Sequence, residues 1–217
     1  MHFRRYDCFL LDWDGCLAAT LPIWMELCQE ALASRRIVVP EAQVALELFS
    51  DWAGPARLGV QDAQAFAAEI QRGLEERQAE VRLNPETAET LRALRRRGAR
   101  TAILTASLRR LVEPVLGRNG MQDAVDLLLC FEDVRRCKPD PEVVFKALDH
   151  FQAEPECALM VGDSQVDIRT AHGAGVAACL YYPPANRRYY DLAALQATGP
   201  DRVISDLSEL LELAGPA

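Results

Sequence analysis

The stretch FLLDWDGCLAAT, residues 9–20, places two carboxylates, Asp12 and Asp14, directly after a short apolar run. A continuous apolar run of this length is typical of a strand that is buried on both faces. Carboxylates beside such a strand are costly to bury unless a cation or a hydrogen-bond donor meets them. The stretch therefore predicts a buried strand at residues 6–12 that ends in a charged site.

The composition is that of a globular protein and excludes several classes. The 217 residues include 24 Lys and Arg against 32 Asp and Glu, a formal net charge of −8 that argues against nucleic acid as the main partner. Seven cysteines without CxxC spacing are typical of free thiols in a reducing compartment. The N-terminal apolar run is too short for a signal peptide, and no segment approaches the roughly 20 apolar residues of a membrane span. We therefore expect a cytoplasmic protein with no membrane partner, and leave its oligomeric state open.

Strands and helices alternate in the second part of the chain. Strands are predicted at 100–105, 126–131, 157–163 and 176–182, helices at 84–98, 107–120, 140–151 and 164–175, and a short strand and helix at 201–213. The expected helix N-caps are Asn84, Ser107 and Ser164, and Pro114 is expected to bend or shorten its helix. Strands that alternate with helices favour right-handed crossovers and a parallel sheet. The predicted fold class is therefore α/β.

The segment between the first strand and this alternation has helical periodicity and no convincing strand. A helical block of this length is best explained as an insertion mounted above one edge of the sheet. We expect residues 19–82 to form a helical domain, and residues 1–18 with 83–217 to form the α/β core domain.

Polar side chains follow four of the predicted strands, and ligands of open parallel sheets bind beyond those strand ends. Several carboxylates around one point attract a hard divalent cation such as Mg²⁺, especially where a phosphate oxygen completes its shell. A lysine and a hydroxyl can hold a phosphoryl group, and one carboxylate can attack phosphorus while a second serves as acid and base. The side chains at these ends are Asp12 and Asp14, Thr105 with Ala106, Lys138, and Asp163 with Asp167.

Four segments carry a family resemblance. DWDGC (12–16), LTAS (104–107), CKPDPEVV (137–144) and VGDSQVDIRTA (161–171) resemble, in order, the signature motifs of the haloacid dehalogenase superfamily. Their spacing resembles its phosphoglycolate-phosphatase-like branch, which has a helical cap inserted after the first motif. The resemblance implies a Rossmann-like parallel sheet core with an inserted α-helical cap domain.

The resemblance also implies roles for individual residues. Asp12 would be the nucleophile. The Mg²⁺ ligands would be the Asp12 and Asp163 carboxylates and the backbone carbonyl of Asp14. The Asp14 carboxyl would be the general acid and base. The remaining implied roles are phosphoryl binding by Thr105 and the N–H of Ala106, charge neutralisation by Lys138, and steering of a metal-bound water or of Lys138 by Asp167 at the metal site.

This sequence departs from the family pattern at three positions, Trp13, Cys16 and Ala106, where Phe or Leu, Thr, and Asn or Ser are usual. None of the three removes a catalytic group. The expected activity is a magnesium-dependent phosphatase that hydrolyses a small phosphorylated metabolite through an aspartyl-phosphate. The alternatives are a phosphomutase of the same superfamily, whose members carry Glu where this chain has Gly162, and a non-enzymatic phospho-acceptor module, which has no use for a cap.

Substrate choice is expected to reside in the helical insertion, where SDWAGPARLGVQ (50–61) interrupts the helices. Arg57 or Asp51 could reach the leaving group from this loop, although Arg57 fits a solvated surface charge equally well. Trp24 is expected to pack in the core or the cap in preference to serving as a substrate platform. The aromatic and basic stretch at 181–191 is expected to be a solvated loop, with a rim loop or a contact surface as the alternatives.

Overall fold

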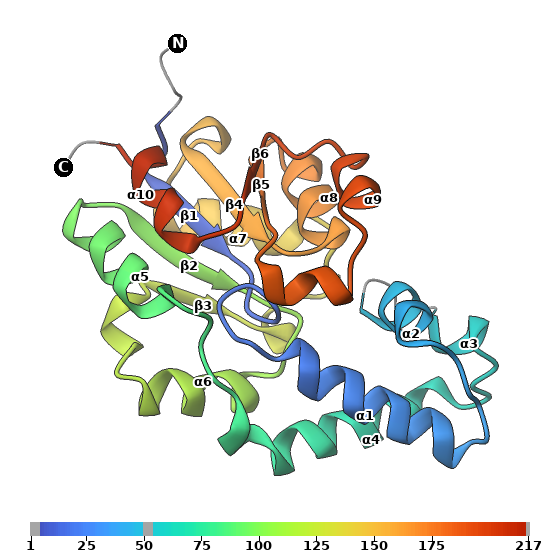
Figure 1. The fold of residues 1–217 in the computed structure, drawn as a ribbon. Helices are drawn as coiled ribbons and strands as arrows, with labels where there is room; N and C mark the ends of the chain where they lie inside the picture. The colour runs from blue at the N-terminus through green and yellow to red at the C-terminus, as the bar shows by residue number, and fades with distance from the viewer. Residues whose placement is uncertain (1–4, 50–53, 216–217) are drawn as a thin grey trace.

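A six-stranded parallel sheet forms the centre of the computed structural model, which describes residues 5–49 and 54–215 (Figure 1). The strand order is β3-β2-β1-β4-β5-β6, the order of doubly wound dinucleotide-binding folds. The strands are β1 (Cys8–Leu11), β2 (Arg100–Leu104), β3 (Leu127–Leu129), β4 (Ala158–Gly162), β5 (Ala177–Tyr181) and β6 (Arg202–Ile204). The predicted α/β class and parallel sheet are confirmed, and β1 lies in the middle with β2 and β4 beside it.

Helices cover both faces of the sheet, since successive residues of β1 belong to two separate hydrophobic clusters: Phe9 and Leu11 to one, Cys8 and Leu10 to the other. The first cluster includes α5 (Thr87–Arg96), α6 (Arg109–Arg118) and α10 (Leu210–Leu213). The second includes α7 (Glu142–Phe151), α8 (Gln165–Gly173) and α9 (Leu192–Gln196). Short 3₁₀ turns lie at Gln78–Glu80, Gln122–Ala124, Phe131–Asp133, Pro155–Cys157, Pro184–Arg188 and Leu207–Glu209.

A helical block lies between β1 and α5 in sequence and beside the sheet in space (Figure 1). It contains α1 (Leu21–Ser34), α2 (Glu41–Leu48), α3 (Gly54–Arg57) and α4 (Ala63–Glu76). The chain leaves the core and returns to it through a paired ribbon, because Ala18 and Leu83 form an antiparallel bridge and the N–H of Ala19 donates to the Arg82 carbonyl at 2.8 Å. The hydrophobic cluster of the α5–α6 face continues into this block.

In the part of the chain that the structure describes, no helix combines the length and the apolar character that crossing a membrane requires.

Asn84 does not serve as the predicted N-cap, because α5 begins at Thr87 and Glu86 occupies the N-cap position with φ of 61°. The Asn84 amide instead donates to the backbone carbonyls of Gly15 and Cys16, at 3.2 and 2.7 Å. Buried carbonyls need donors, and here an amide from beyond the insertion supplies them to the loop after β1.

Pro114 does not end its helix, since α6 runs to Arg118. A proline cannot donate to the carbonyl four residues earlier, which here is that of Arg110. The side-chain amide of Gln78 donates to this carbonyl at 3.1 Å, and the Arg118 guanidinium donates to the Gln78 carbonyl at 2.7 Å. The last turn of the insertion is therefore hydrogen-bonded to α6 at the Arg110 carbonyl, which Pro114 cannot pair.

We expect Asn84→Ala to lower the free energy of unfolding by about 1–3 kcal/mol, because the buried Cys16 carbonyl loses its donor. For a chain of this size the melting temperature should fall by ~3–10 °C, measured by calorimetry. The matched control is Thr20→Val, because the Thr20 hydroxyl is buried with no hydrogen-bond partner among the described residues and its removal should cost nothing. Equal losses in both variants would contradict this assignment.

Candidate active site at the carboxyl end of β1

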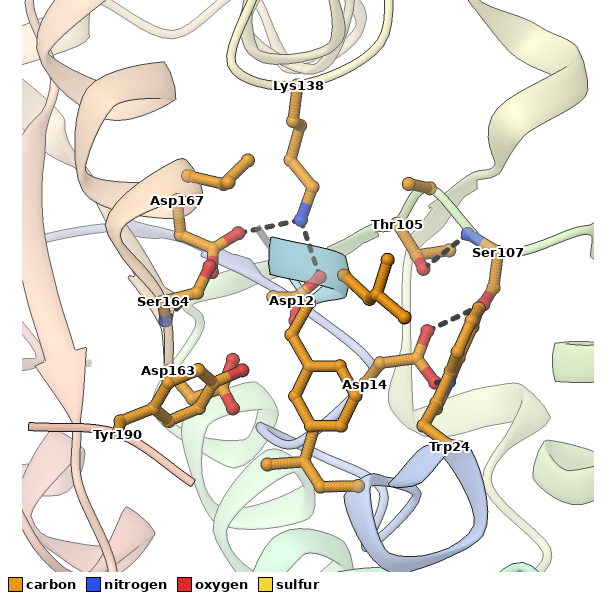
Figure 2. Close-up of a pocket in the computed structure, with 15 residues that line it drawn as sticks. Asp12, Asp14, Trp24, Thr105, Ser107, Lys138, Asp163, Ser164, Asp167 and Tyr190 are labelled. Carbon is orange, nitrogen blue, oxygen red and sulfur yellow. Dashed lines mark hydrogen bonds and ion pairs between the residues drawn. The ribbon is translucent and has the colours of Figure 1, made fainter. Parts of the chain in front are cut away.

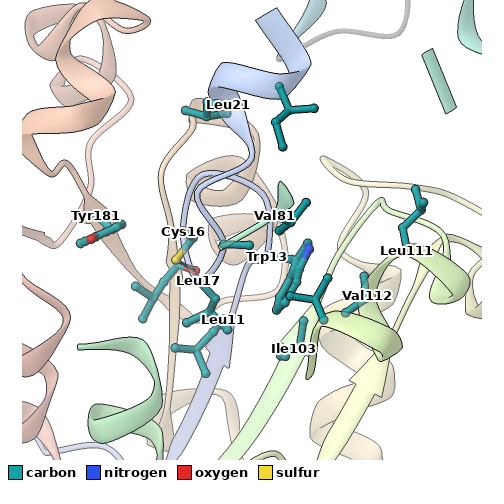
Figure 3. Packing of buried hydrophobic residues seen from close by; sticks show 14 of the residues in the cluster. Leu11, Trp13, Cys16, Leu17, Leu21, Val81, Ile103, Leu111, Val112 and Tyr181 are labelled. Atoms are coloured by element: carbon teal, nitrogen blue, oxygen red, sulfur yellow. Dashed lines mark hydrogen bonds between the residues drawn. The ribbon is translucent and has the colours of Figure 1, made fainter. Parts of the chain in front are cut away.

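The loop after β1 sends alternate side chains in opposite directions. Trp13 is 2% exposed and lies in the hydrophobic cluster beside Ile103 and Val112 (Figure 3). Asp12 and Asp14, on either side of it, line the pocket at the strand end. The period-two alternation of an extended chain therefore delivers both carboxylates to one place.

Gly15 permits the turn that follows, because its φ is +78° and a Cβ built on it would lie 2.0 Å from Oδ2 of Asp163. Cys16 then turns inward, is fully buried, and directs its thiol at the Val161 carbonyl. The glycine brings the backbone of the first motif against the carboxylate that follows β4.

Lys138 joins the carboxylates into one cluster (Figure 2). Its Nζ lies 2.5 Å from Oδ1 of Asp12 and 2.7 Å from Oδ1 of Asp167, and all three side chains are buried. Asp167 also accepts from the hydroxyl of Ser164 at 2.7 Å, at the start of α8, where Ser164 occupies the predicted N-cap position. Ligand oxygens of Asp12, Asp163 and Asp167 lie within 4.8 Å of one another.

The charges of this cluster do not balance. Burial raises the pKa of Asp12 to about 7, against the attraction of Lys138 and with the repulsion of Asp167 and Asp14. Burial likewise raises the pKa of Asp163, to which the nearby Asp12 and Asp167 contribute. Burial acts to lower the pKa of Lys138, but Asp12 and Asp167 outweigh it and the pKa is raised. The cluster therefore holds more carboxylates than its ammonium can neutralise.

A divalent cation fits this surplus of negative charge. The donors are carboxylate oxygens, which hard cations prefer, and they are buried and close together. The Asp14 carboxylate is not part of this oxygen group, so the backbone carbonyl remains the part of Asp14 that the predicted metal site would use.

The carboxylate of Asp14 is held by one residue of the core and one of the helical block. Oδ2 accepts from the Ser107 hydroxyl at 2.6 Å, and Oδ1 accepts from the Trp24 indole N–H at 3.2 Å (Figure 2). Ser107 is therefore not the predicted N-cap, a position that Leu108 occupies. Trp24 does more than pack, because its N–H reaches the site from α1.

Thr105 and Ala106 lie beside these carboxylates in the pocket. The Thr105 Oγ1 accepts from the N–H of Ser107 at 2.9 Å, which leaves its hydroxyl proton available to a ligand. The N–H of Ala106 has no hydrogen-bond partner within residues 5–49 and 54–215. The end of β2 thus offers two donors to an anion.

The stretch at 181–191 is part of the site, and its interpretation as a solvated loop is wrong. Asn186 is 4% exposed and its amide donates to the Gly15 carbonyl at 3.0 Å and to Oδ2 of Asp163 at 3.1 Å. Tyr190 lines the pocket and packs edge-on against Phe49 of the helical block. This loop therefore supplies hydrogen-bond donors to the buried Gly15 carbonyl of the first motif and to the Asp163 carboxylate of the fourth. The sequence did not indicate this role, because the polar residues of the loop are of types that are usually exposed.

Comparison with known proteins identifies the family. The model of the haloacid dehalogenase-like hydrolases matches residues 6–175. The chain belongs to the haloacid dehalogenase-like hydrolase family. This confirms the predicted superfamily.

Individual relatives share about a quarter to a third of their residues with this chain. A pyrophosphatase PpaX of Bacillus cereus (strain B4264) is 36% identical over 126 residues, which are 58% of this chain and 56% of that relative. The chain thus spans little more than half the length of the curated relatives it matches. A haloacid dehalogenase-like hydrolase structure from Bacteroides fragilis is 27% identical with a TM-score of 0.84, over 95% of this chain and 100% of that one. A hydrolase of the family from Deinococcus radiodurans R1, with bound phosphate and sodium, is 25% identical with a TM-score of 0.77, over 98% and 99%.

Arg57, for which a substrate contact and a surface charge were both expected, is not among the described residues that line the pocket. Its Nε is 2.5 Å from Oε2 of Glu47, so the guanidinium is paired within the helical block. Glu47 belongs to α2 and Arg57 to α3, and these two helices are in contact. Asp51, the other residue predicted to reach the leaving group, lies outside the described residues.

The raised pKa of Asp12 predicts a pH-dependent stability in the absence of divalent cations. The folded protein favours the protonated carboxyl, so this contribution is present at low pH and is lost as the pH rises through about 7. Asp12→Asn removes the titration, so at pH 8 in excess chelator its melting temperature should exceed that of the wild type by ~5–10 °C. The difference should shrink as the pH falls from 7 toward 4, the usual pKa range of the carboxyl, and Mg²⁺ should raise the wild-type value at pH 8. Parallel melting curves for both proteins across this pH range would argue against a charge surplus.

Proposed function

We propose that this chain is a magnesium-dependent phosphatase that hydrolyses a small phosphomonoester through an aspartyl-phosphate on Asp12. The observation that carries the proposal is the position of Asp12, whose carboxylate lies between the Lys138 ammonium, the carboxylate cluster and a pocket lined by Thr105 and Ala106. A nucleophile, a charge-neutralising group and phosphoryl donors meet there. The phosphate bound to the Deinococcus radiodurans relative supports this substrate class.

In the proposed reaction Asp12 attacks phosphorus, and the bond from phosphorus to the leaving oxygen breaks. Asp14 gives its proton to that oxygen, so the product leaves as an alcohol. Asp14 then takes a proton from water as the water oxygen attacks the aspartyl-phosphate, which releases inorganic phosphate and restores Asp12. Lys138, the Thr105 hydroxyl and the Ala106 N–H hold the phosphoryl oxygens throughout.

Asp12, Asp163 and the Asp14 carbonyl would hold Mg²⁺, which when bound supplies positive charge to the phosphoryl oxygens and offsets the carboxylates. Asp167 would act through Lys138, whose ammonium it holds at 2.7 Å. Residues 19–82 would form the cap that covers this site, since Trp24 and Phe49 of that segment come to the pocket.

Water is the proposed acceptor, in preference to a second position on a sugar phosphate. A Cβ at Gly162 would lie 2.3 Å from Cγ of Asp167. Mutases of the superfamily carry Glu at this position. A Glu side chain here would collide with Asp167 in its present place, so this site cannot hold both. The phospho-acceptor alternative is disfavoured because the helical block contributes side chains directly to the site.

Removal of the nucleophile tests the proposal directly. Hydrolysis of 4-nitrophenyl phosphate should require Mg²⁺ and fall below detection in Asp12→Asn, because the variant lacks the carboxylate on which the proposed intermediate forms. The measurement is nitrophenolate release with and without excess chelator, and circular dichroism of the variant serves as the folding control. Undiminished turnover in the variant, or in chelator, would overturn the assignment.

Asp14→Asn should affect substrates according to their leaving groups. Loss of the proton donor should reduce turnover of an alkyl phosphate by ~10²–10⁴-fold and that of 4-nitrophenyl phosphate far less, because nitrophenolate leaves without a proton.

Ser107→Ala and Trp24→Phe each remove one of the two hydrogen-bond donors to Asp14. Each should reduce turnover of the alkyl phosphate by about 10-fold and turnover of 4-nitrophenyl phosphate less. Ser205→Ala, at an exposed serine, is the matched control. Equal losses on both substrates in Asp14→Asn would rule out the acid role.

A further inference from the structure

A second cavity of about 80 Å³ adjoins the catalytic pocket of about 170 Å³. The two share four lining residues, Trp24, Leu48, Ala106 and Ser107. Trp24 and Ser107 are the residues that hold Asp14, and Figure 2 shows them together beside its carboxylate. The second cavity therefore begins at the two residues that hold the group proposed to protonate the leaving oxygen, and we call it the leaving-group chamber.

The leaving-group chamber is apolar. It lies between α1, α4 and the start of α6, and no charged side chain among the described residues lines it. Gln71, on α4, is half-buried and supplies an amide. The other residues that line the chamber alone are Cys28, Pro55, Phe66, Ala67, Ile70, Leu74, Leu108 and Leu111.

A second anionic group on the substrate would find no cation here. Lys138 is the one cationic side chain that lines either cavity in the described part of the chain, and it is already paired with Asp12 and Asp167. Residues 50–53 are Ser-Asp-Trp-Ala, a sequence without a basic side chain. A carboxylate or second phosphate in the chamber would lose its hydration without a partner and would lie close to Asp14.

We propose that the leaving group of the substrate is uncharged, compact and mainly apolar, as in an aryl or short branched-alkyl phosphomonoester, and that it binds in the leaving-group chamber. This rests on the proposed function, since the chamber is defined by its position beside Asp14. The reaction is the one given above: water enters, the phosphorus–oxygen bond of the ester breaks, and an uncharged alcohol leaves with phosphate. The chamber of about 80 Å³ is smaller than the apolar cavity of about 150 Å³ that encloses benzene, so an aryl ring would occupy the chamber in part and extend from it into the catalytic pocket.

A matched pair of esters tests the charge preference. Phenyl phosphate and 4-carboxyphenyl phosphate differ by one carboxylate, and the carboxylate makes the phenol a slightly better leaving group. The wild type with Mg²⁺ should nevertheless have a kcat/KM at least ~10-fold higher for phenyl phosphate, as expected for an unpaired charge near a carboxylate. Equal values, or a preference for the carboxylated ester, would overturn the proposal.

Variants at Gln71 assign the preference to the chamber. Gln71→Lys puts a cation there and should reduce the ratio of the two kcat/KM values by about 10-fold, whereas Gln71→Glu should increase it. Lys and Glu are both good helix formers, so either substitution should leave α4 intact at this half-buried position. Gln64→Lys makes the same change on the same helix at an exposed position outside the chamber and should leave the ratio unchanged. A ratio that responds equally to the Gln64 and Gln71 changes would refute the role of the chamber.

Binding separates this inference from the proposed function. Titration calorimetry of the wild type in Mg²⁺ should show phenylphosphonate binding ~10-fold more tightly than 4-carboxyphenylphosphonate, and Gln71→Lys should remove the difference. If no ester is hydrolysed but this difference holds, the proposed function fails and the chamber assignment stands. If esters are hydrolysed but both phosphonates bind alike, the chamber assignment fails and the phosphatase proposal stands.

Discussion

One buried ammonium in contact with two buried carboxylates is the interaction on which the site depends. Lys138 reaches Asp12, which follows β1, and Asp167, in the first turn of α8, which follows the neighbouring strand β4. A buried charge is tolerated only with partners at close range, so each of these residues fixes the place of the other two. The surrounding chain is shaped to allow this. Gly15 and Gly162 have no side chain at the two points where one would collide with a carboxylate.

The same site also joins the two parts of the chain. On one side Gln78 and Arg118 fasten the end of the insertion to α6, and on the other Phe49 packs against Tyr189 and Tyr190 of the loop after β5. Between these two contacts, Trp24 places an N–H on Asp14. The orientation of that carboxylate therefore depends on how the helical block is seated on the core.

The sequence allowed the sheet, the helical insertion and the strand-end residues to be predicted, because these depend on periodicity and on the rule that parallel strands present their carboxyl ends together. It did not allow the residues that support them to be predicted. Ser107 and Asn84 both look like helix caps locally, but buried acceptors elsewhere in the fold compete for their donors. Asn186 follows a strand end, which was a usable signal, yet the basic and aromatic residues around it are equally typical of an exposed loop. For Arg57 the sequence left a substrate contact and a surface charge equally open, because its ion-pair partner, Glu47, lies on a different helix and no local pattern links the two residues.

The continuity of the hydrophobic cluster has a consequence for protein engineering. Apolar residues of α1 and α4, such as Met25 and Ile70, belong to the same cluster as Leu111 and Val112 of α6, whereas the cluster on the opposite face of the sheet is separate. Protein interiors are packed closely, so a domain boundary placed within one cluster separates side chains that fit each other and leaves both parts poorly packed against a new partner. The helical block is thus no interchangeable module at the level of packing. A chimaera that grafts it onto another core, or a foreign cap onto this one, has to carry the facing side chains of α6 along with it.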